Sequence, residues 1–133
     1  MMILIVDDEV NTRIGLVKLL CQDGYQTDAV ANGIEALEYL EKKMVDLVIT
    51  DINMPEMNGF VFFHQLTQYY PDIKVIMITA YSGVERFLHL TDSEYPTCLH
   101  KPFKVEELRA LIRNSLQQPY SLKGTIAPDR RRP

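Results

Sequence analysis

The most constraining feature of this chain is a regular alternation of short apolar runs with helical patterns. Three of the runs are continuous rather than alternating in polarity, namely MILIVD at residues 2–7, LVIT at 47–50 and VIMIT at 75–79. Continuous runs of this length are typical of central parallel strands that helices cover on both faces. The more polar run YQTDAV at 25–30 predicts one edge strand, and TCLH at 97–100 predicts the other.

Helical patterns fill the intervals between these runs, at about residues 10–22, 33–43, 59–69, 83–91 and 104–117. In the first, Ile14, Val17, Leu20 and Cys21 fall on one face, which predicts that this face packs on the sheet. Five strand–helix units without a repeat or internal linker indicate an α/β fold with a doubly wound, five-stranded parallel sheet and right-handed crossovers.

Composition narrows the class of protein. A chain of 133 residues fits one domain with a real core. The net charge is -4, but it is unevenly distributed. Residues 120–133 carry four basic side chains, Lys123 and Arg130–Arg132, and one acidic side chain, Asp129. Residues 1–119 therefore hold 10 basic and 17 acidic side chains, a net charge of -7. An acidic body argues against nucleic-acid binding by the folded part, and the basic run is typical of a solvated tail.

The sequence also indicates a compartment. No apolar run is long enough to span a membrane, and no signal peptide is visible. Cys21 and Cys98 form neither a CxxC motif nor a metal-ligand spacing, so we expect reduced cysteines in the core of a cytoplasmic protein.

Polar residues collect where the predicted strands end. The first strand ends in Asp7 and Asp8, the third in Asp51, the fourth in Thr79 and Ala80, and the fifth leads to Lys101 and Pro102. In doubly wound sheets the ligand site lies beyond the carboxyl ends of the strands. If the strand order is 2-1-3-4-5, the acid-bearing strands are neighbours about 4.8 Å apart, and the five groups converge on one pocket.

Three carboxylates in one pocket need a positive partner, because each pair repels by roughly 4 kcal/mol at 4 Å and an effective dielectric of 20. Hard oxygen ligands without imidazole or thiolate favour Mg²⁺. Lys101 and Thr79 are suited to stabilising a phosphoryl group in transfer, and the small Ala80 would leave the pocket open. Asp51 is then the best candidate for an acceptor that forms an aspartyl phosphate.

Each of these residues also has an ordinary structural interpretation. An acid pair after a strand is often a helix N-cap, and Asp8 or Asn11 could serve that way. A threonine at a strand end is commonplace, and Lys-Pro is usually a loop. The joint placement of these residues on successive strand ends favours the functional interpretation.

At this point the sequence resembles the receiver domain of two-component response regulators. ILIVDDE resembles the opening acidic motif, ANGIEALEYL the second helix, DLVITDINMPEMNGF the phosphoacceptor strand and loop, YPDIKVIMITAY the switch strand and KPF the lysine motif. The motifs occur in the family's order over about residues 2–117.

The resemblance implies a flavodoxin-like fold and phosphotransfer from the phosphohistidine of a sensor kinase or phosphotransfer protein to Asp51. It implies that Asp8 and Asp51, with Asp7 through water and the backbone carbonyl of Asn53, hold Mg²⁺. Lys101 would contact the phosphoryl group, and Thr79 would turn inward to bind it. The Lys101–Pro102 bond would be cis, a state that proline makes accessible.

The sequence departs from the family where the signal is transmitted. The family commonly has an aromatic residue three positions before the lysine, where this chain has Cys98, and Tyr95 is our candidate for the missing aromatic. Tyr81 and Asn53 flank the expected path of water and are candidates for tuning the lifetime of the phosphate. In the family, the responding surface is usually helix four, strand five and helix five.

Three functional classes follow. The leading one is a phosphorylatable regulatory switch that promotes its own phosphorylation and dephosphorylation and is not otherwise an enzyme. The second is a pseudo-receiver that acts as a protein-interaction module without phosphotransfer. The third is an aspartyl-phosphate hydrolase, which Asn53 at the position two after Asp51 and the short chain disfavour.

The predicted organisation is a receiver domain at residues 1–119 and a flexible tail, or the start of a linker to an output domain, at 120–133. A stand-alone receiver and a receiver cut from a longer regulator remain equal alternatives. The expected partners are a sensor kinase or phosphotransfer protein, an output domain or effector protein, and a second copy of the chain, with no membrane and no nucleic acid bound directly.

Overall fold

The computed structural model describes residues 1–52, 57, 59–79 and 97–117. Its strands are β1 (Met2–Val6), β2 (Gln26–Val30), β3 (Leu47–Asp51), β4 (Lys74–Thr79) and β5 (Thr97–His100). Its helices are α1 (Val10–Gln22), α2 (Gly33–Lys42), α3 (Gly59–Tyr69) and α5 (Val105–Gln117). The helix predicted at residues 83–91 lies outside the described residues.

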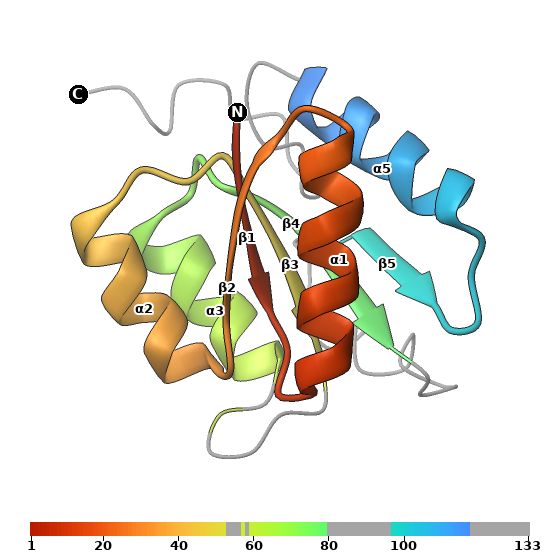
Figure 1. Ribbon diagram of the computed structural model, residues 1–133. Helices are drawn as coiled ribbons and strands as arrows, with labels where there is room; N and C mark the ends of the chain where they lie inside the picture. Colours follow the sequence, from red (N-terminus) through yellow and green to blue (C-terminus); the bar gives the residue numbers. More distant parts are fainter. Residues whose placement is uncertain (53–56, 58, 80–96, 118–133) are drawn as a thin grey trace.

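The five strands form one parallel sheet in the order β2-β1-β3-β4-β5, as predicted. The two runs that were expected at the edges, 25–30 and 97–100, supply the edge strands β2 and β5. Figure 1 shows α1 and α5 on one face of the sheet and α2 and α3 on the other. The fold is therefore the flavodoxin-like, doubly wound α/β fold.

The continuous apolar runs supply both faces of the sheet because successive side chains of a strand point to opposite sides. In β1, Leu4 belongs to a buried cluster with Phe62 and Leu66 of α3, whereas its neighbour Ile5 belongs to a second cluster with Leu20 of α1 and Leu108 of α5. All six of these side chains are at most 1% exposed. Full burial of a side chain of this size contributes about 1.5–3 kcal/mol.

The prediction of which residues of α1 face the core is partly wrong. Leu20 is fully buried and Val17 packs against the second cluster, but Ile14 is 62% exposed and Cys21 is exposed. Helix α1 carries apolar residues on several faces, so spacing alone does not identify the face that packs, and Leu16 and Leu19 share that role. The expectation that both cysteines are core residues fails for Cys21, while Cys98 is half-buried against the first cluster.

Within the described residues, no helix has both the length and the apolar character that crossing a bilayer requires. Each helix starts at the edge of the sheet where the strands end and returns to the opposite edge (Figure 1). We call these the carboxyl edge and the amino edge. The predicted site residues that the structure describes fall at the carboxyl edge, namely Asp7, Asp8, Asp51, Thr79, Lys101 and Pro102.

Candidate functional site

Residues from three strand ends, those of β1, β3 and β5, meet at the carboxyl edge. One carboxylate oxygen from each of Asp7, Asp8 and Asp51 can be chosen so that all three atoms lie within 4.8 Å of one another. The ammonium Nζ of Lys101 lies 3.8 Å from Oδ2 of Asp51. The acids and the lysine that were predicted to converge are therefore brought together.

Asp7 is the buried member of this group, with 5% of its surface exposed. Its backbone N–H donates to the carbonyl of Val30 on β2 at 3.1 Å, which continues the pairing of β1 and β2 by one residue. Its carboxylate Oδ1 accepts a hydrogen bond from the backbone N–H of Glu9 at 2.8 Å. The aspartate is thus held at both its backbone and its side chain.

Neither Asp8 nor Asn11 is the N-cap of α1. That position belongs to Glu9, whose carboxylate Oε1 accepts from the backbone N–H of Thr12 at 2.7 Å and from its hydroxyl at 2.9 Å. These hydrogen bonds, with a smaller contribution from the charge of Arg13, lower the pKa of the Glu9 carboxyl. Because Glu9 caps the helix, the exposed carboxylate of Asp8 is left within the acidic group.

Asp51 is the last residue of β3, and its side chain is 14% exposed. Beyond it, the N–H of Gly59 at the start of α3 donates to the carbonyl of Ile52 at 2.7 Å. A Cβ at position 59 would lie 2.7 Å from both the Asp51 carbonyl oxygen and the Ile52 Cα, closer than such atoms can approach. Glycine is therefore required where α3 begins against the backbone of Asp51.

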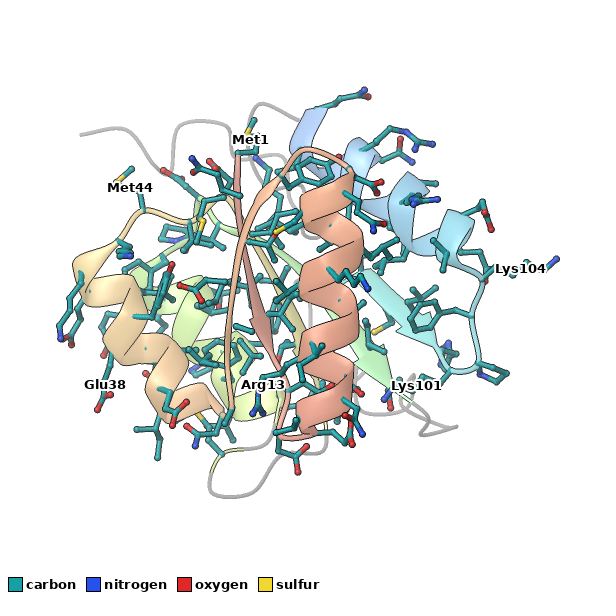
Figure 2. The ribbon with its side chains drawn as sticks, viewed as in Figure 1. Met1, Arg13, Glu38, Met44, Lys101 and Lys104 are labelled. Atoms are coloured by element: carbon teal, nitrogen blue, oxygen red, sulfur yellow. The ribbon has the colours of Figure 1, made fainter. Side chains whose placement is uncertain are left out.

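Thr79 and Lys101 come from the last two strands. Thr79 ends β4 and is fully buried, and its carbonyl accepts a hydrogen bond from the N–H of Lys101 at 2.7 Å. The Lys101–Pro102 peptide bond is cis. Figure 2 shows the side chain of Lys101 at the carboxyl edge. The lysine can therefore contact a group bound to Asp51.

Burial and the neighbouring negative charges both raise the pKa of Asp7. The pKa of Asp7 is raised, first because burial disfavours its charged form, and also because Asp51 and Asp8 are negatively charged. The hydrogen bond from Glu9 and the charge of Lys101 oppose this shift. The group of acids is therefore short of positive charge when all three are ionised.

This deficit can be tested against the metal that the sequence implies. Three carboxylates with closely spaced oxygens are a hard donor set, and the group contains neither histidine nor cysteine. Such a set suits Mg²⁺, which prefers oxygen ligands and needs only one or two carboxylates besides water and phosphate. The residues present fit the ion.

Four of the predicted site residues lie outside the described residues, namely Asn53, Ala80, Tyr81 and Tyr95. Cys98, at the position of the family's usual aromatic, lies on β5 in register with Met77 of β4 and packs on the first apolar cluster. It fills an apolar position beside the strand that carries Thr79.

Two residues of the carboxyl edge were not singled out from the sequence. One is Gly59, whose signal is a glycine at the start of the helix that follows the acceptor turn. The other is Arg13, whose guanidinium Nη1 donates to the backbone carbonyl of Asp7 at 2.7 Å. Its signal is a basic residue one turn into the helix that follows the acid pair.

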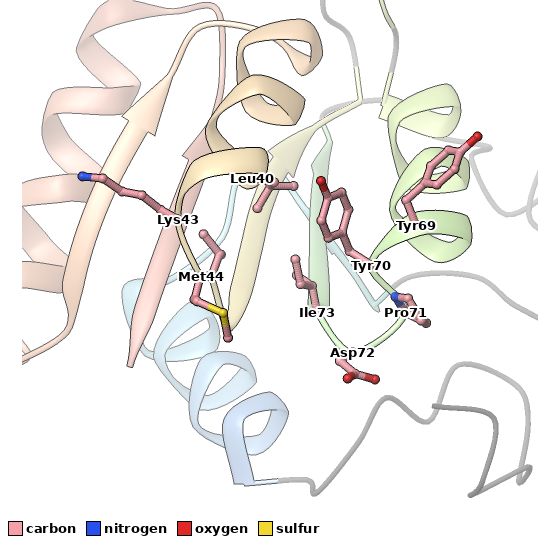
Figure 3. A pocket seen from close by; sticks show the side chains of 9 residues that line it. Leu40, Lys43, Met44, Tyr69, Tyr70, Pro71, Asp72 and Ile73 are labelled. Atoms are coloured by element: carbon pink, nitrogen blue, oxygen red, sulfur yellow. The ribbon is translucent and has the colours of Figure 1, made fainter. Parts of the chain in front are cut away.

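A hollow lies at the amino edge, and its chemistry differs from that of the acidic group. It measures about 280 Å³ and is lined by Leu40, Lys43, Met44, Val45, Tyr69, Tyr70, Pro71, Asp72 and Ile73. Figure 3 shows Leu40 and Met44 on one side of it and Tyr70 and Ile73 on the other. With one carboxylate and one ammonium among mostly apolar side chains, it does not have the donors that a metal ion and a phosphoryl group require.

Comparison with known proteins identifies the family. Residues 3–113 match the response regulator receiver domain. The chain belongs to this family. Over 114 residues, which are 86% of this chain and 92% of the relative, the receiver is 34% identical to sporulation initiation phosphotransferase F of Bacillus subtilis. It also resembles the crystal structure of response regulator protein TrrA from Thermotoga maritima in complex with Mg²⁺-BeF, with a TM-score of 0.77, 35% identity and coverage of 86% of this chain and 98% of that one.

Receiver domains also occur within much longer relatives. Sensor kinase CckA of Brucella abortus is 34% identical over 118 residues, which are 87% of this chain but 12% of that kinase. The receiver described here thus has relatives of its own size and relatives that are several times longer. Its place is in two-component signal transduction.

Proposed function

We propose that this receiver is a phosphorylation-dependent switch that accepts a phosphoryl group onto Asp51 from a phosphohistidine of a sensor kinase or phosphotransfer protein. The observation that carries the proposal is the meeting of Asp7, Asp8 and Asp51 within 4.8 Å, with the ammonium of Lys101 3.8 Å from Asp51. One carboxylate can act as a nucleophile only if the charge of the other two is balanced. In the proposal, Mg²⁺ supplies that balance and offsets charge on the phosphoryl oxygens.

In the proposed reaction, a carboxylate oxygen of Asp51 attacks phosphorus, and the phosphorus–nitrogen bond of the donor breaks. The electron pair of that bond stays on the imidazole, which takes up a proton, and an aspartyl phosphate is formed. Lys101 would then contact a phosphoryl oxygen, and Asp8, Asp51 and the backbone carbonyl of Asn53 would hold the cation, with Asp7 contributing through water. Asp51 is oriented for this attack because its backbone is fixed between β4 and the start of α3.

The response to phosphorylation is assigned to the strand ends beside Asp51. We expect the hydroxyl of Thr79 to bind the new phosphoryl group, with the small Ala80 leaving space for it, and Tyr95 to move with Thr79 in place of the aromatic that Cys98 replaces. Phosphorylation adds negative charge and acceptor oxygens at one point, which a two-state segment can convert into a change of surface. Tyr81 and Asn53 are proposed to set the lifetime of the phosphate, which the rate of phosphate loss in Tyr81→Ala would measure.

The proposal also includes the bounds of the domain, the surface that binds partners and the cellular compartment. It assigns the receiver to residues 1–119 and a tail or linker to 120–133, and it names helix four, β5 and α5 as the surface for an effector or a second copy. It makes the domain a regulatory phosphoacceptor rather than an enzyme with a separate substrate. The compartment proposed is the cytoplasm, where reduced cysteines such as Cys21 and Cys98 are expected.

The experiment is the intact mass of the protein after incubation with acetyl phosphate or phosphoramidate, with and without Mg²⁺. We expect wild type to gain one phosphoryl group only when Mg²⁺ is present, and Asp51→Asn to gain none. Asp46→Asn is the matched control, because Asp46 precedes the other end of β3, where its carboxylate accepts from the N–H of Met2, and this variant should still be phosphorylated. Folded wild-type protein that gains no mass would refute phosphotransfer and favour the pseudo-receiver.

A further inference from the structure

The side chain of Arg13 reaches back from the first turns of α1 to the end of β1. Its Nη1 donates to the carbonyl oxygen of Asp7 at 2.7 Å, six residues earlier in the chain, and the contact is half-buried. Figure 2 shows Arg13 at the carboxyl edge, the same edge as Lys101. Arginine is suited to this contact because its planar guanidinium is always charged and has donors in a fixed geometry.

The Arg13 contact completes a set of three hydrogen bonds on one acid. The N–H of Asp7 is held by the carbonyl of Val30 at 3.1 Å, its carboxylate by the N–H of Glu9 at 2.8 Å, and its carbonyl by Arg13 at 2.7 Å. The first contact ties the turn to β2, and the other two tie it to the start of α1. Asp8 lies between these anchors in the sequence, so the same contacts restrict where its exposed carboxylate can go.

We propose that Arg13 is a positioning residue that holds the turn between β1 and α1 so that the carboxylates of Asp7 and Asp8 face Asp51, and that it thereby sets the affinity for a divalent cation. This inference rests on the cation site of the proposed function. Groups that orient metal ligands from outside the ligand set typically change metal affinity by about 10- to 100-fold when they are removed. Arg13 has this relation to Asp7, because it contacts the backbone of the acid rather than its carboxylate.

The sign of the effect separates positioning from simple charge. A guanidinium near the acids repels a divalent cation, so if charge were its only influence, removing it would strengthen cation binding. If Arg13 positions the turn, removing it weakens binding although the local charge becomes more negative. The two effects of one substitution therefore have opposite directions.

The experiment measures binding of Mn²⁺ alone, as a spectroscopic stand-in for Mg²⁺, by the electron paramagnetic resonance signal of the free ion. The variants are Arg13→Gln, which removes both the charge and the planar guanidinium donors, and Arg13→Lys, which keeps the charge. Lys18→Gln is the matched control, because it removes one positive charge from an exposed position of the same helix. Circular dichroism and thermal unfolding of each variant report whether α1 still folds.

We expect Arg13→Gln to bind Mn²⁺ about tenfold more weakly than wild type, Arg13→Lys to recover part of the loss, and Lys18→Gln to bind equally or slightly more tightly. Equal or tighter binding by folded Arg13→Gln would overturn the inference. If Arg13→Gln does not fold, folded Arg13→Lys must bind at least threefold more weakly than wild type, and wild-type affinity in that variant would overturn the inference. Because no phosphoryl donor is present, these outcomes are independent of whether Asp51 can be phosphorylated.

Discussion

The two edges of the sheet are built from the same strands and helices, yet they differ in every chemical respect. The carboxyl edge holds three acids whose oxygens lie within 4.8 Å, a lysine and a buried threonine. The amino edge holds a mostly apolar hollow beside Met44 and Tyr69, which are 91% and 67% exposed. The difference follows the direction of the chain, because helices of this fold begin at the carboxyl edge and turn their positive ends toward anions there.

The backbone beside the acids is held by short hydrogen bonds. At the carboxyl edge, backbone groups beside the acids are fixed by contacts such as Gly59 to Ile52 and Lys101 to Thr79, both at 2.7 Å. At the amino edge, Met44 lies almost entirely in solvent. We therefore expect substitutions beside the acids to change both stability and chemistry, and substitutions at exposed amino-edge positions such as Met44 to change neither.

The largest effect is expected from Gly59→Ala. The new Cβ would lie 2.7 Å from the Asp51 carbonyl oxygen and from the Ile52 Cα, which are backbone atoms that cannot rotate away. Overpacking of this kind destabilises a protein by about 1–3 kcal/mol, and the shift of Asp51 should also slow its phosphorylation. Thermal unfolding and the time course of the gain in mass measure the two effects.

Gly15→Ala is the control for this prediction. Among the described residues, no atom outside the neighbouring turns of α1 lies within 4 Å of a Cβ at position 15, which is in the middle of that helix. Alanine is the better helix former by about 0.5–1 kcal/mol, so Gly15→Ala should stabilise the protein and leave phosphorylation unchanged. A Gly59→Ala variant as stable as wild type would show that the backbone after Asp51 can move.

Asp7→Asn is expected to change stability by less than Gly59→Ala and in the opposite direction. At neutral pH and without a divalent cation, it should stabilise the protein. The pKa of Asp7 is raised above its ordinary value of 3.8 by burial and by its acidic neighbours, so the folded state binds this proton more tightly than the unfolded state. The stability that this provides is complete below pH 3.8 and is lost as the pH rises through the folded-state pKa. Above that pH the ionised carboxylate opposes folding.

Asparagine removes the charge while its amide oxygen can still accept from Glu9. We expect the melting temperature to rise by about 2–6 °C at pH 7, corresponding to about 1 kcal/mol, and the gain to vanish below pH 3.8. Saturating Mg²⁺ should reverse the order of stability, because wild type then gains binding free energy that the variant has partly lost. Glu38→Gln, at an exposed position of α2, is the control for loss of one negative charge. A lower melting temperature of Asp7→Asn in cation-free buffer would contradict the prediction.

The order of strands and the positions of the acids could be predicted from the sequence because both depend on local pattern. The continuous apolar runs identify the strands, and the alternation of strands and helices leaves few topologies. Once the order 2-1-3-4-5 is assumed, residues that follow a strand must gather at one edge, so Asp7 and Asp51 had to be neighbours.

The contacts that hold the acids depend on side-chain geometry, which pattern does not contain. The N-cap of α1 illustrates this point. The sequence suggested Asp8 or Asn11 as the cap, but Glu9, which lies between them, occupies that position. The burial of Cys21 was mispredicted because α1 has apolar residues on more than one face. Arg13 was overlooked because its partner is a backbone carbonyl, which has no signature in the sequence.

The smallest effect is expected from Met44→Gln at the amino edge. Met44 borders the hollow between α2 and α3 but is 91% exposed, so its side chain loses almost no buried surface when it becomes polar. Substitutions at such positions usually change stability by no more than about 0.5 kcal/mol. We expect the rate of phosphorylation of Asp51 to stay within about twofold of wild type, because no contact of Met44 reaches the carboxyl edge among those described. A larger change in that rate, with an unchanged melting temperature, would show that the two edges are coupled through the sheet and would end the distinction drawn between them.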